Sequence, residues 1–203
     1  MNAIATETDQ PVLAVPFGGG FFVGRMRVDG EVYGLIVAPR AEGETEMAWN
    51  DNYKTVSGAL SWHDGLANTQ AMAEAGSNLA KWALGLDIAG YTDWYIPAQD
   101  ELEVMYRALK PTTRENYQYA RSGINLSAFE PTYPYTANRP SQTLSGDFKE
   151  GGAEAFEDEW YWSSTQHSDY SYCAWGQSFS DGNQDNSLKV DCFRARAVRR
   201  FKL

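Results

Sequence analysis

The sequence predicts an α+β fold: two helices, much irregular loop and a small antiparallel sheet, preceded by an N-terminal β-hairpin. Three observations support this class: β-rich runs near both ends, helix-type apolar periodicity between residues 65 and 109, and a Pro-, Ser-, Thr- and Asn-rich stretch over residues 116–152. The chain has 203 residues, 43% of them hydrophobic and 14% aromatic, which is typical of a globular protein with a sizeable core.

The first element expected is the hairpin. Residues 1–16 are polar and then mixed, which indicates an arm. Phe21–Val28 and Glu31–Ala38 are β-rich runs, and the Asp29-Gly30 pair between them is a strong signal for a two-residue hairpin turn. The acidic segment Pro39–Thr55 is expected to be a loop.

Two helices should follow. Apolar residues recur at helical spacing over Gly65–Leu84, with Asn68 and Thr69 near the expected N-cap and Gly85 as the C-cap. A second apolar stripe spans Ala98–Leu109, where Gln99 or Asp100 can serve the N-terminus. The short run Trp94-Tyr95-Ile96 between the two helices reads as a strand.

The last part of the chain is expected to be loop and then strand. Regular structure should be scarce over Asn116–Gly152. Ala174–Ser180 reads as a strand that turns at Asp181-Gly182, and Phe193–Phe201 as the final strand.

Charge and patterning exclude several classes of function. The net charge is −10, so non-specific nucleic-acid binding is not expected, because phosphate contacts need a basic surface. No basic and apolar leader opens the chain and no apolar run is long enough to span a bilayer, so neither a secretion signal nor membrane insertion is expected. Pairing with carboxylates is favoured over an anion site for the basic residues near the C-terminus, which are Arg194, Arg196, Arg199, Arg200 and Lys202.

Three blocks of sequence carry a family resemblance. The first block, Gly90–Pro97 with Glu101-Leu102, resembles G-x-x-D-W-R-L-P-T-x-x-E-L. The second, Trp160–Thr165, resembles Y-W-S-S-T, and the third, Phe193–Arg199, resembles R-A-R-x-V-R. Together they resemble the Lcl C-terminal domain family, named after a collagen-like adhesin, over roughly residues 55–203. The resemblance implies a fold similar to C-type lectins and the formylglycine-generating enzyme. Tyr95 and Ala98 depart from the usual Arg and Thr, which affects packing detail.

A narrower resemblance is to the variable proteins of phage diversity-generating retroelements. It implies that residues 1–54 serve attachment or oligomerisation and that residues 55–203 form a ligand-binding domain. It further implies a virion protein made in the host cytoplasm, in a tail fibre or an equivalent position. Its partners would be a host cell-surface receptor, protein or glycan, and other virion proteins. The analogy with phage tropism determinants implies a homo-oligomer, a trimer by that analogy.

The window Gln166–Cys192 is the expected binding face. Tyr supplies rigid contact area, and Ser, Asn and Asp supply adaptable hydrogen bonds, as in antibody paratopes. Tyr170 and Tyr172 would share a face if they lay in a strand. An ordinary solvated loop has the same composition and stays the alternative. The candidate ligand-binding residues are His167, Asp169, Tyr170, Tyr172, Cys173, Gln177, Ser178, Ser180, Asn183, Asp185, Asn186 and Asp191.

Other chemistries have weaker signals. A core position is favoured over carbohydrate stacking for Trp94, Trp160, Trp162 and Trp175. The run Asp181–Asp185 alternates oxygen ligands but lacks the Gly and Glu of an EF-hand, so no cofactor is expected, with Ca²⁺ as the alternative. Cys173 and Cys192 either form a disulfide or stay as free thiols.

No catalytic site is predicted from these residues, so the expected function is non-enzymatic recognition. The two histidines lie outside any nucleophile motif, and the two cysteines are too far apart for the oxidase chemistry of the formylglycine relatives. A structural virion protein, in a decoration or baseplate, is the alternative function. A formylglycine-type oxidase is the third reading.

Overall fold

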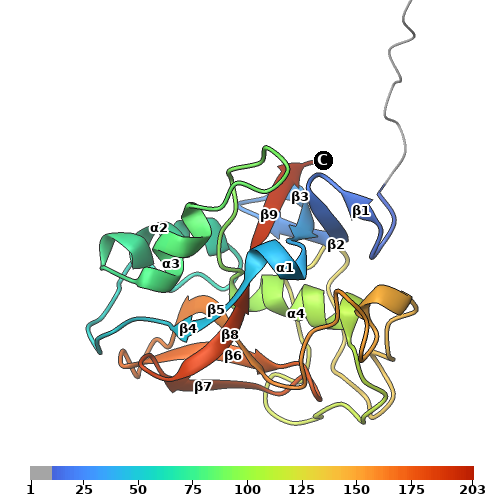
Figure 1. The fold of residues 1–203 in the computed structure, drawn as a ribbon. Helices are drawn as coiled ribbons and strands as arrows, with labels where there is room; N and C mark the ends of the chain where they lie inside the picture. Colours follow the sequence, from blue (N-terminus) through green and yellow to red (C-terminus); the bar gives the residue numbers. More distant parts are fainter. Residues whose placement is uncertain (1–10) are drawn as a thin grey trace, which may run out of the picture.

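The computed structural model describes residues 11–203 and consists of two β-sheets with helices packed between and beside them (Figure 1). The α+β class predicted from the sequence is confirmed. The first ten residues of the predicted arm lie outside the described residues. The first sheet has the order β1-β2-β3-β9 and contains Pro16–Phe17, Gly20–Val28, Glu31–Val37 and Val198–Lys202.

The second sheet has five strands in the order β4-β8-β5-β6-β7, which are Glu44–Ala48, Cys192–Arg196, Trp160–Gln166, Cys173–Ser178 and Gln184–Leu188. Its neighbours are antiparallel except β5 and β8, which are parallel. The sequence predicts one small antiparallel sheet, so the finding of two sheets with one parallel pair corrects that expectation.

The predicted N-terminal hairpin is confirmed. β2 and β3 pair antiparallel, and the turn residues Asp29 and Gly30 have φ angles of 50° and 87°. A two-residue turn with both central φ angles positive matches the twist of the strands it joins, which explains the Asp-Gly pair. β3 also pairs with β9, so the hairpin and the C-terminal strand belong to one sheet.

The predicted single final strand over Phe193–Phe201 is wrong. β8 ends at Arg196 in the second sheet and β9 begins at Val198 in the first, and Figure 1 shows this segment running from one sheet to the other. Ala197 lies at the crossing, where its N–H donates to the Gly43 carbonyl. The alternation of apolar and basic residues breaks at the crossing, where Ala197 and Val198 are both apolar and Arg199 and Arg200 are both basic. This local break does not indicate which strand each side pairs with.

The predicted long helix Gly65–Leu84 is two helices, α2 (Gly65–Glu74) and α3 (Asn78–Leu84). Gly76 between them has a φ of 97°, and the Ser77 side chain accepts from the Ala80 N–H as a new N-cap. The expected caps at Asn68 and Thr69 are therefore wrong, and both are buried inside α2, whose N-cap is Asp64. Gly85 closes α3 as predicted.

The other elements divide between confirmed and corrected predictions. Helix α4 spans Gln99–Leu109, and residues 116–152 hold only the short 3₁₀ helix η1 (Gly146–Phe148), both as expected. The predicted loop Pro39–Thr55 instead contains α1 (Arg40–Gly43) and β4. The expected strand at Trp94–Ile96 amounts to one isolated bridge between Tyr95 and Val198. Strand β7 was not predicted.

The core lies between the two sheets and around α4. Its largest cluster joins Leu102, Met105 and Tyr106 of α4 to Tyr161 and Phe179. A second cluster lies under α2 and α3, and a third includes Trp94. The core prediction is confirmed for Trp94 and Trp162, each with 0% exposed surface. Trp160 and Trp175 are only half-buried, so the core prediction does not hold for them.

Candidate ligand-binding surface

The three motif blocks meet in the structure, where their polar groups bind one another. Asp93 of the first block accepts from Arg199 of the third through two parallel bonds, at 2.6 Å from Nε and 3.0 Å from Nη2. The Arg199 guanidinium also lies over the Tyr91 ring, 4.0 Å from its centroid. Bidentate pairing fixes geometry as well as adding energy, so this pair ties the turn before Trp94 to strand β9.

Glu101 holds together the start of two helices. Its Oε2 accepts from the N–H groups of Ala98 at 2.7 Å and Gly65 at 3.2 Å, and its Oε1 accepts from the Tyr95 hydroxyl at 2.7 Å. Burial raises the pKa of this carboxyl to about 7, and the backbone bond from Ala98 and the Tyr95 hydroxyl oppose that rise. The acid of the first block thus caps α4 and joins it to α2.

The second block supplies the remaining cap of α4. The Thr165 hydroxyl accepts from the Gln99 N–H at 3.0 Å and donates to the Ser61 carbonyl at 2.8 Å. The Ser164 N–H donates to the Pro97 carbonyl at 2.7 Å. These side chains are fully buried, so the block positions the helix and offers nothing to a ligand.

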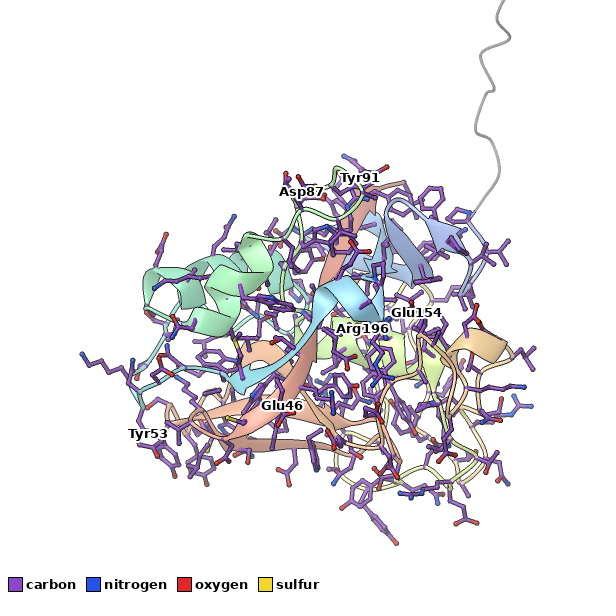
Figure 2. The ribbon with its side chains drawn as sticks, in the orientation of Figure 1. Glu46, Tyr53, Asp87, Tyr91, Glu154 and Arg196 are labelled. Carbon is purple, nitrogen blue, oxygen red and sulfur yellow. The ribbon has the colours of Figure 1, made fainter. Side chains whose placement is uncertain are left out.

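The basic residues near the C-terminus are paired with carboxylates, as predicted. Arg196 is the most buried of them, and Figure 2 shows it beside Glu154 in the centre of the molecule, where the two form an ion pair. Its Nε also donates to the Ala38 carbonyl at 2.9 Å. The remaining pairs are Arg194 with Glu44 and Glu159, Arg199 with Asp93, Arg200 with Asp64 and Lys202 with Glu31.

The candidate window has a different character, because its loop over residues 167–172 presents rings to solvent. The His167 Nδ1 accepts from the N–H groups of Asp169 and Tyr170, both at 3.1 Å, so the imidazole holds the backbone of this loop. The His167 N–H donates to the Cys173 carbonyl. Tyr170 and Tyr172 are 51% and 45% exposed and lie in this loop, so the strand geometry considered for them does not occur.

Five rings form a continuous line that we call the aromatic row: Trp62, Trp175, His167, Tyr170 and Tyr172. Successive ring centroids lie 5.1, 5.1, 4.7 and 5.9 Å apart. His167 and Trp175 are stacked at 14°, and the other pairs are tilted. Each ring is half-buried or exposed, so the row is a rigid, amphipathic surface of the kind that binding sites use.

A cation closes one end of the aromatic row. The Arg121 guanidinium lies 4.0 Å from the centroid of the Trp62 ring and pairs with Asp100 at 2.7 Å. Asp100 also accepts from the Ser127 hydroxyl at 2.6 Å. Arg121 and Asp100 are thus paired with each other at this end, whereas the Tyr170 and Tyr172 end is open.

The structure brings only part of the predicted set to the row. His167, Tyr170 and Tyr172 belong to it, Asp169 lies in the same exposed loop, and Asn186 faces Trp175 across the β6–β7 pair. Asp185, on β7, is also exposed, and Asp191 accepts from the Ser187 hydroxyl at 2.8 Å.

The other predicted ligand-binding residues are buried or lie away from the aromatic row. Gln177 is fully buried and donates to the Tyr135 hydroxyl and the Gly182 carbonyl. Ser178 and Cys173 are also buried, so these three side chains do not reach a ligand on the observed surface. Ser180 and Asn183 lie at the turn between β6 and β7, at the far end of β6 from the row.

The sequence prediction missed two residues of this region and placed one in the core. Trp62 and Arg121 lie far from the window in sequence, and no local pattern marks them as neighbours of Trp175. Trp175 itself occupies an outward position of β6, since the adjacent Ala174 is fully buried. The sequence shows no such alternation, since Cys173, Ala174 and Trp175 are all apolar, so the outward position of Trp175 is visible only in the structure.

The remaining expectations concern thiols and metals. Cys173 and Cys192 are free thiols, and burial raises the pKa of Cys173. The Asp181 and Asp185 carboxylates accept from the N–H groups of Asn183 and Asn186. Across residues 11–203, no three His, Cys, Asp or Glu side chains gather closely enough to hold a metal ion, and Ca²⁺ binding stays an untested alternative. No helix in the same range is long and apolar enough to cross a membrane.

Comparison with known protein families shows which family the chain belongs to. The Lcl C-terminal domain profile matches residues 41–199, which include all three motif blocks. The chain belongs to the Lcl C-terminal domain family. No match is found among curated proteins. Membership suggests at most an adhesin-like, receptor-binding protein. The residues of the family motifs bind other groups of the same chain, so the motifs do not identify a ligand.

Proposed function

We propose that this Lcl C-terminal domain is a non-enzymatic, adhesin-like recognition domain that contacts its receptor through the aromatic row. The observation that carries the proposal is the row itself, five stacked or tilted rings that run from half-buried Trp62 to exposed Tyr172. Rings held rigidly lose little conformational entropy on binding, and aromatic residues dominate the energetics of many interfaces. Asp169 and Asn186 would add hydrogen bonds beside the rings.

The more specific form of the proposal is a phage receptor-binding protein on a C-type lectin-like scaffold. It would sit at a tail fibre or an equivalent exposed position of the virion and bind a host surface molecule as a homo-oligomer. The exposed residues of the window would be the ones diversified by a retroelement. Support comes from the window's composition and from its contrast with the buried motif residues beside it.

Sequencing the gene in a propagated population tests the diversification directly. We expect substitutions at adenine-containing codons for exposed Tyr170 and Tyr172 and for half-buried Asn186, and a near-copy template with a reverse transcriptase nearby. Buried Gln177 and the turn residue Gly182 should stay constant, which provides an internal control within the same window. An invariant window without a template would contradict the diversification.

Binding to cells tests recognition without knowledge of the receptor. The labelled chain should bind cells from its source culture, and Trp175→Ala and Tyr170→Ala should each weaken that binding by about tenfold or more. Tyr119→Ala is the matched control, because Tyr119 is 73% exposed and lies outside the aromatic row. Equal binding by all variants would rule out the row. Binding to particles but not to cells would favour the structural virion role.

A further inference from the structure

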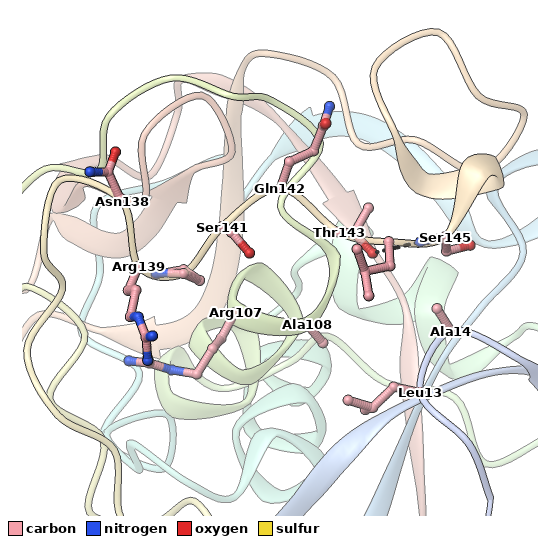
Figure 3. A pocket seen from close by; sticks show the side chains of 12 residues that line it. Leu13, Ala14, Arg107, Ala108, Asn138, Arg139, Ser141, Gln142, Thr143 and Ser145 are labelled. Atoms are coloured by element: carbon pink, nitrogen blue, oxygen red, sulfur yellow. Dashed lines mark hydrogen bonds between the residues drawn. The ribbon is translucent and has the colours of Figure 1, made fainter.

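A second surface, away from the aromatic row, is a groove at the C-terminal end of α4. It has a volume of about 660 Å³ and lies between the N-terminal residues Leu13 and Ala14, the helix residues Arg107 and Ala108, and the loop over residues 138–145. Figure 3 shows these side chains arranged around the opening. None of the ligand-binding residues expected from the sequence lines this groove.

One end of the groove carries two guanidinium groups. In Figure 3 the side chains of Arg107 and Arg139 extend toward each other. Arg107 is partnered through Nε and Nη2, which bind Glu103, and the Gly123 and Tyr133 carbonyls. The guanidinium of Arg139 has no hydrogen bond or ion pair with any residue from 11 to 203. Glu103 thus balances one of the two positive charges, and the other is left without a counter-charge.

The opposite wall of the groove is apolar and open to solvent. Leu144 is 94% exposed and Leu13 is 53% exposed, with Ala14 and Ala108 beside them. Val12 and Val15, next in sequence to these wall residues, are 64% and 46% exposed. Large apolar side chains gathered at one place on a surface usually mark contact with another protein.

The charge and the apolar wall together define what would fit. We propose that this groove docks an extended, acidic segment of a partner protein. A carboxylate of the segment pairs with Arg139 and the outer face of Arg107, and a neighbouring apolar side chain packs on Leu13, Ala108 and Leu144. The chain as a whole has a net charge of −10 and repels an acidic segment at long range, so the pairing depends on these two guanidinium groups.

A peptide titration followed by NMR tests the docking. The probe is acetyl-Leu-Asp-Leu-Asp-amide, added to the ¹⁵N-labelled chain. Two control peptides have Asn in place of Asp, or Ser in place of Leu. We expect saturable shifts of the amides of Leu13, Ala108, Ser141 and Thr143 with the probe, and binding weaker by about tenfold for each control, since each loses one of the two kinds of contact.

Protein variants separate the groove from a general charge effect. Arg139→Gln should weaken probe binding by about tenfold and Leu144→Ser by a smaller factor, and both should fold because both side chains are exposed. Arg114→Gln is the control, since Arg114 is exposed and pairs with Asp158 outside the groove. The proposal is overturned if the three peptides bind alike, if the shifts map elsewhere, or if Arg139→Gln and Arg114→Gln behave alike. Variants of the aromatic row should leave this binding unchanged, so the two surfaces can fail independently.

Discussion

The interior built from the motif blocks and the aromatic row use their polar groups in opposite ways. In the interior, Glu101, Thr165 and Arg196 bind groups of the same chain. In the row, the rings contact one another, but the hydroxyls of Tyr170 and Tyr172 have no hydrogen-bond partner within residues 11–203. Family motifs of this kind therefore report the fold, and the ligand must be sought in the residues between them.

Arg196→Ala should produce the largest loss of stability in the interior. Arg196 is fully buried between Glu154, the Ala38 carbonyl and the rings of Phe148 and Phe156. Removing it takes the guanidinium away from Glu154 and from the buried Glu44 carboxylate, which costs about 3–5 kcal/mol. Urea unfolding measures the change.

Lys202→Ala is the matched control for that substitution. Lys202 pairs with Glu31 at 2.9 Å, but both side chains are more than half exposed. Exposed pairs contribute little, so no measurable change is expected. Equal losses for the two variants would show that burial does not separate the interior pairs from the surface pairs.

The pH dependence of stability should reveal Glu101. Burial raises its folded-state pKa to about 7 from an ordinary value of 4.5, so the folded protein keeps a proton that the unfolded chain has lost. This contribution is fully present below pH 4.5 and is lost as the pH rises through about 7, a change on the order of 3 kcal/mol.

Glu101→Gln isolates that contribution. The amide oxygen can accept from Ala98 and Gly65, and the amide nitrogen can donate to the Tyr95 hydroxyl, so the cap is kept without a charge. Between pH 5 and 8 the wild type should lose stability relative to the variant in urea unfolding. Parallel curves for the two proteins would mean that Glu101 titrates at an ordinary pKa.

Gly182→Ala tests whether part of the window belongs to the interior. Gly182 has a φ of 80°, and a Cβ there would lie 2.4 Å from an atom of the Tyr106 ring. Backbone strain and overpacking together should cost about 2–3 kcal/mol. Gly151→Ala is the control for backbone strain, because Gly151 has a φ of 82° with open space around it. If both variants lose the same amount, the turn is not packed against α4.

Local signals were sufficient for some elements and insufficient for others. Asp29-Gly30 and the stripe of α4 act within a few residues, so the hairpin and that helix could be predicted. The break at Gly76 was also locally marked, by a glycine followed by the N-capping Ser77. The change of sheet at Ala197 depends on pairing with β4 on one side and β3 on the other, which no local pattern contains.

The candidate site shows the same division. The composition of the window predicted His167, Tyr170 and Tyr172 because these residue types suit binding at any exposed position. Gln177 is also a predicted ligand-binding residue, yet it is fully buried on its strand and donates to the Tyr135 hydroxyl. Trp62 and Arg121 reach the row only through the packing of the loop before α2 and the irregular segment after α4. Their place in this surface could therefore not be predicted from the sequence.

Tyr170→Ala should have the smallest effect on stability, and that small effect separates the row from the interior. Tyr170 is 51% exposed and lies in a loop, and within residues 11–203 its ring contacts are with His167 and Tyr172 alone. The free energy of unfolding should therefore change by less than about 0.5 kcal/mol. The same urea unfolding that detects Arg196→Ala measures it. A loss of about 2 kcal/mol or more would place the loop among the structural contacts of the fold. An unchanged free energy of unfolding together with weaker cell binding would mean that the Tyr170 ring contributes to ligand binding and not to the stability of the fold.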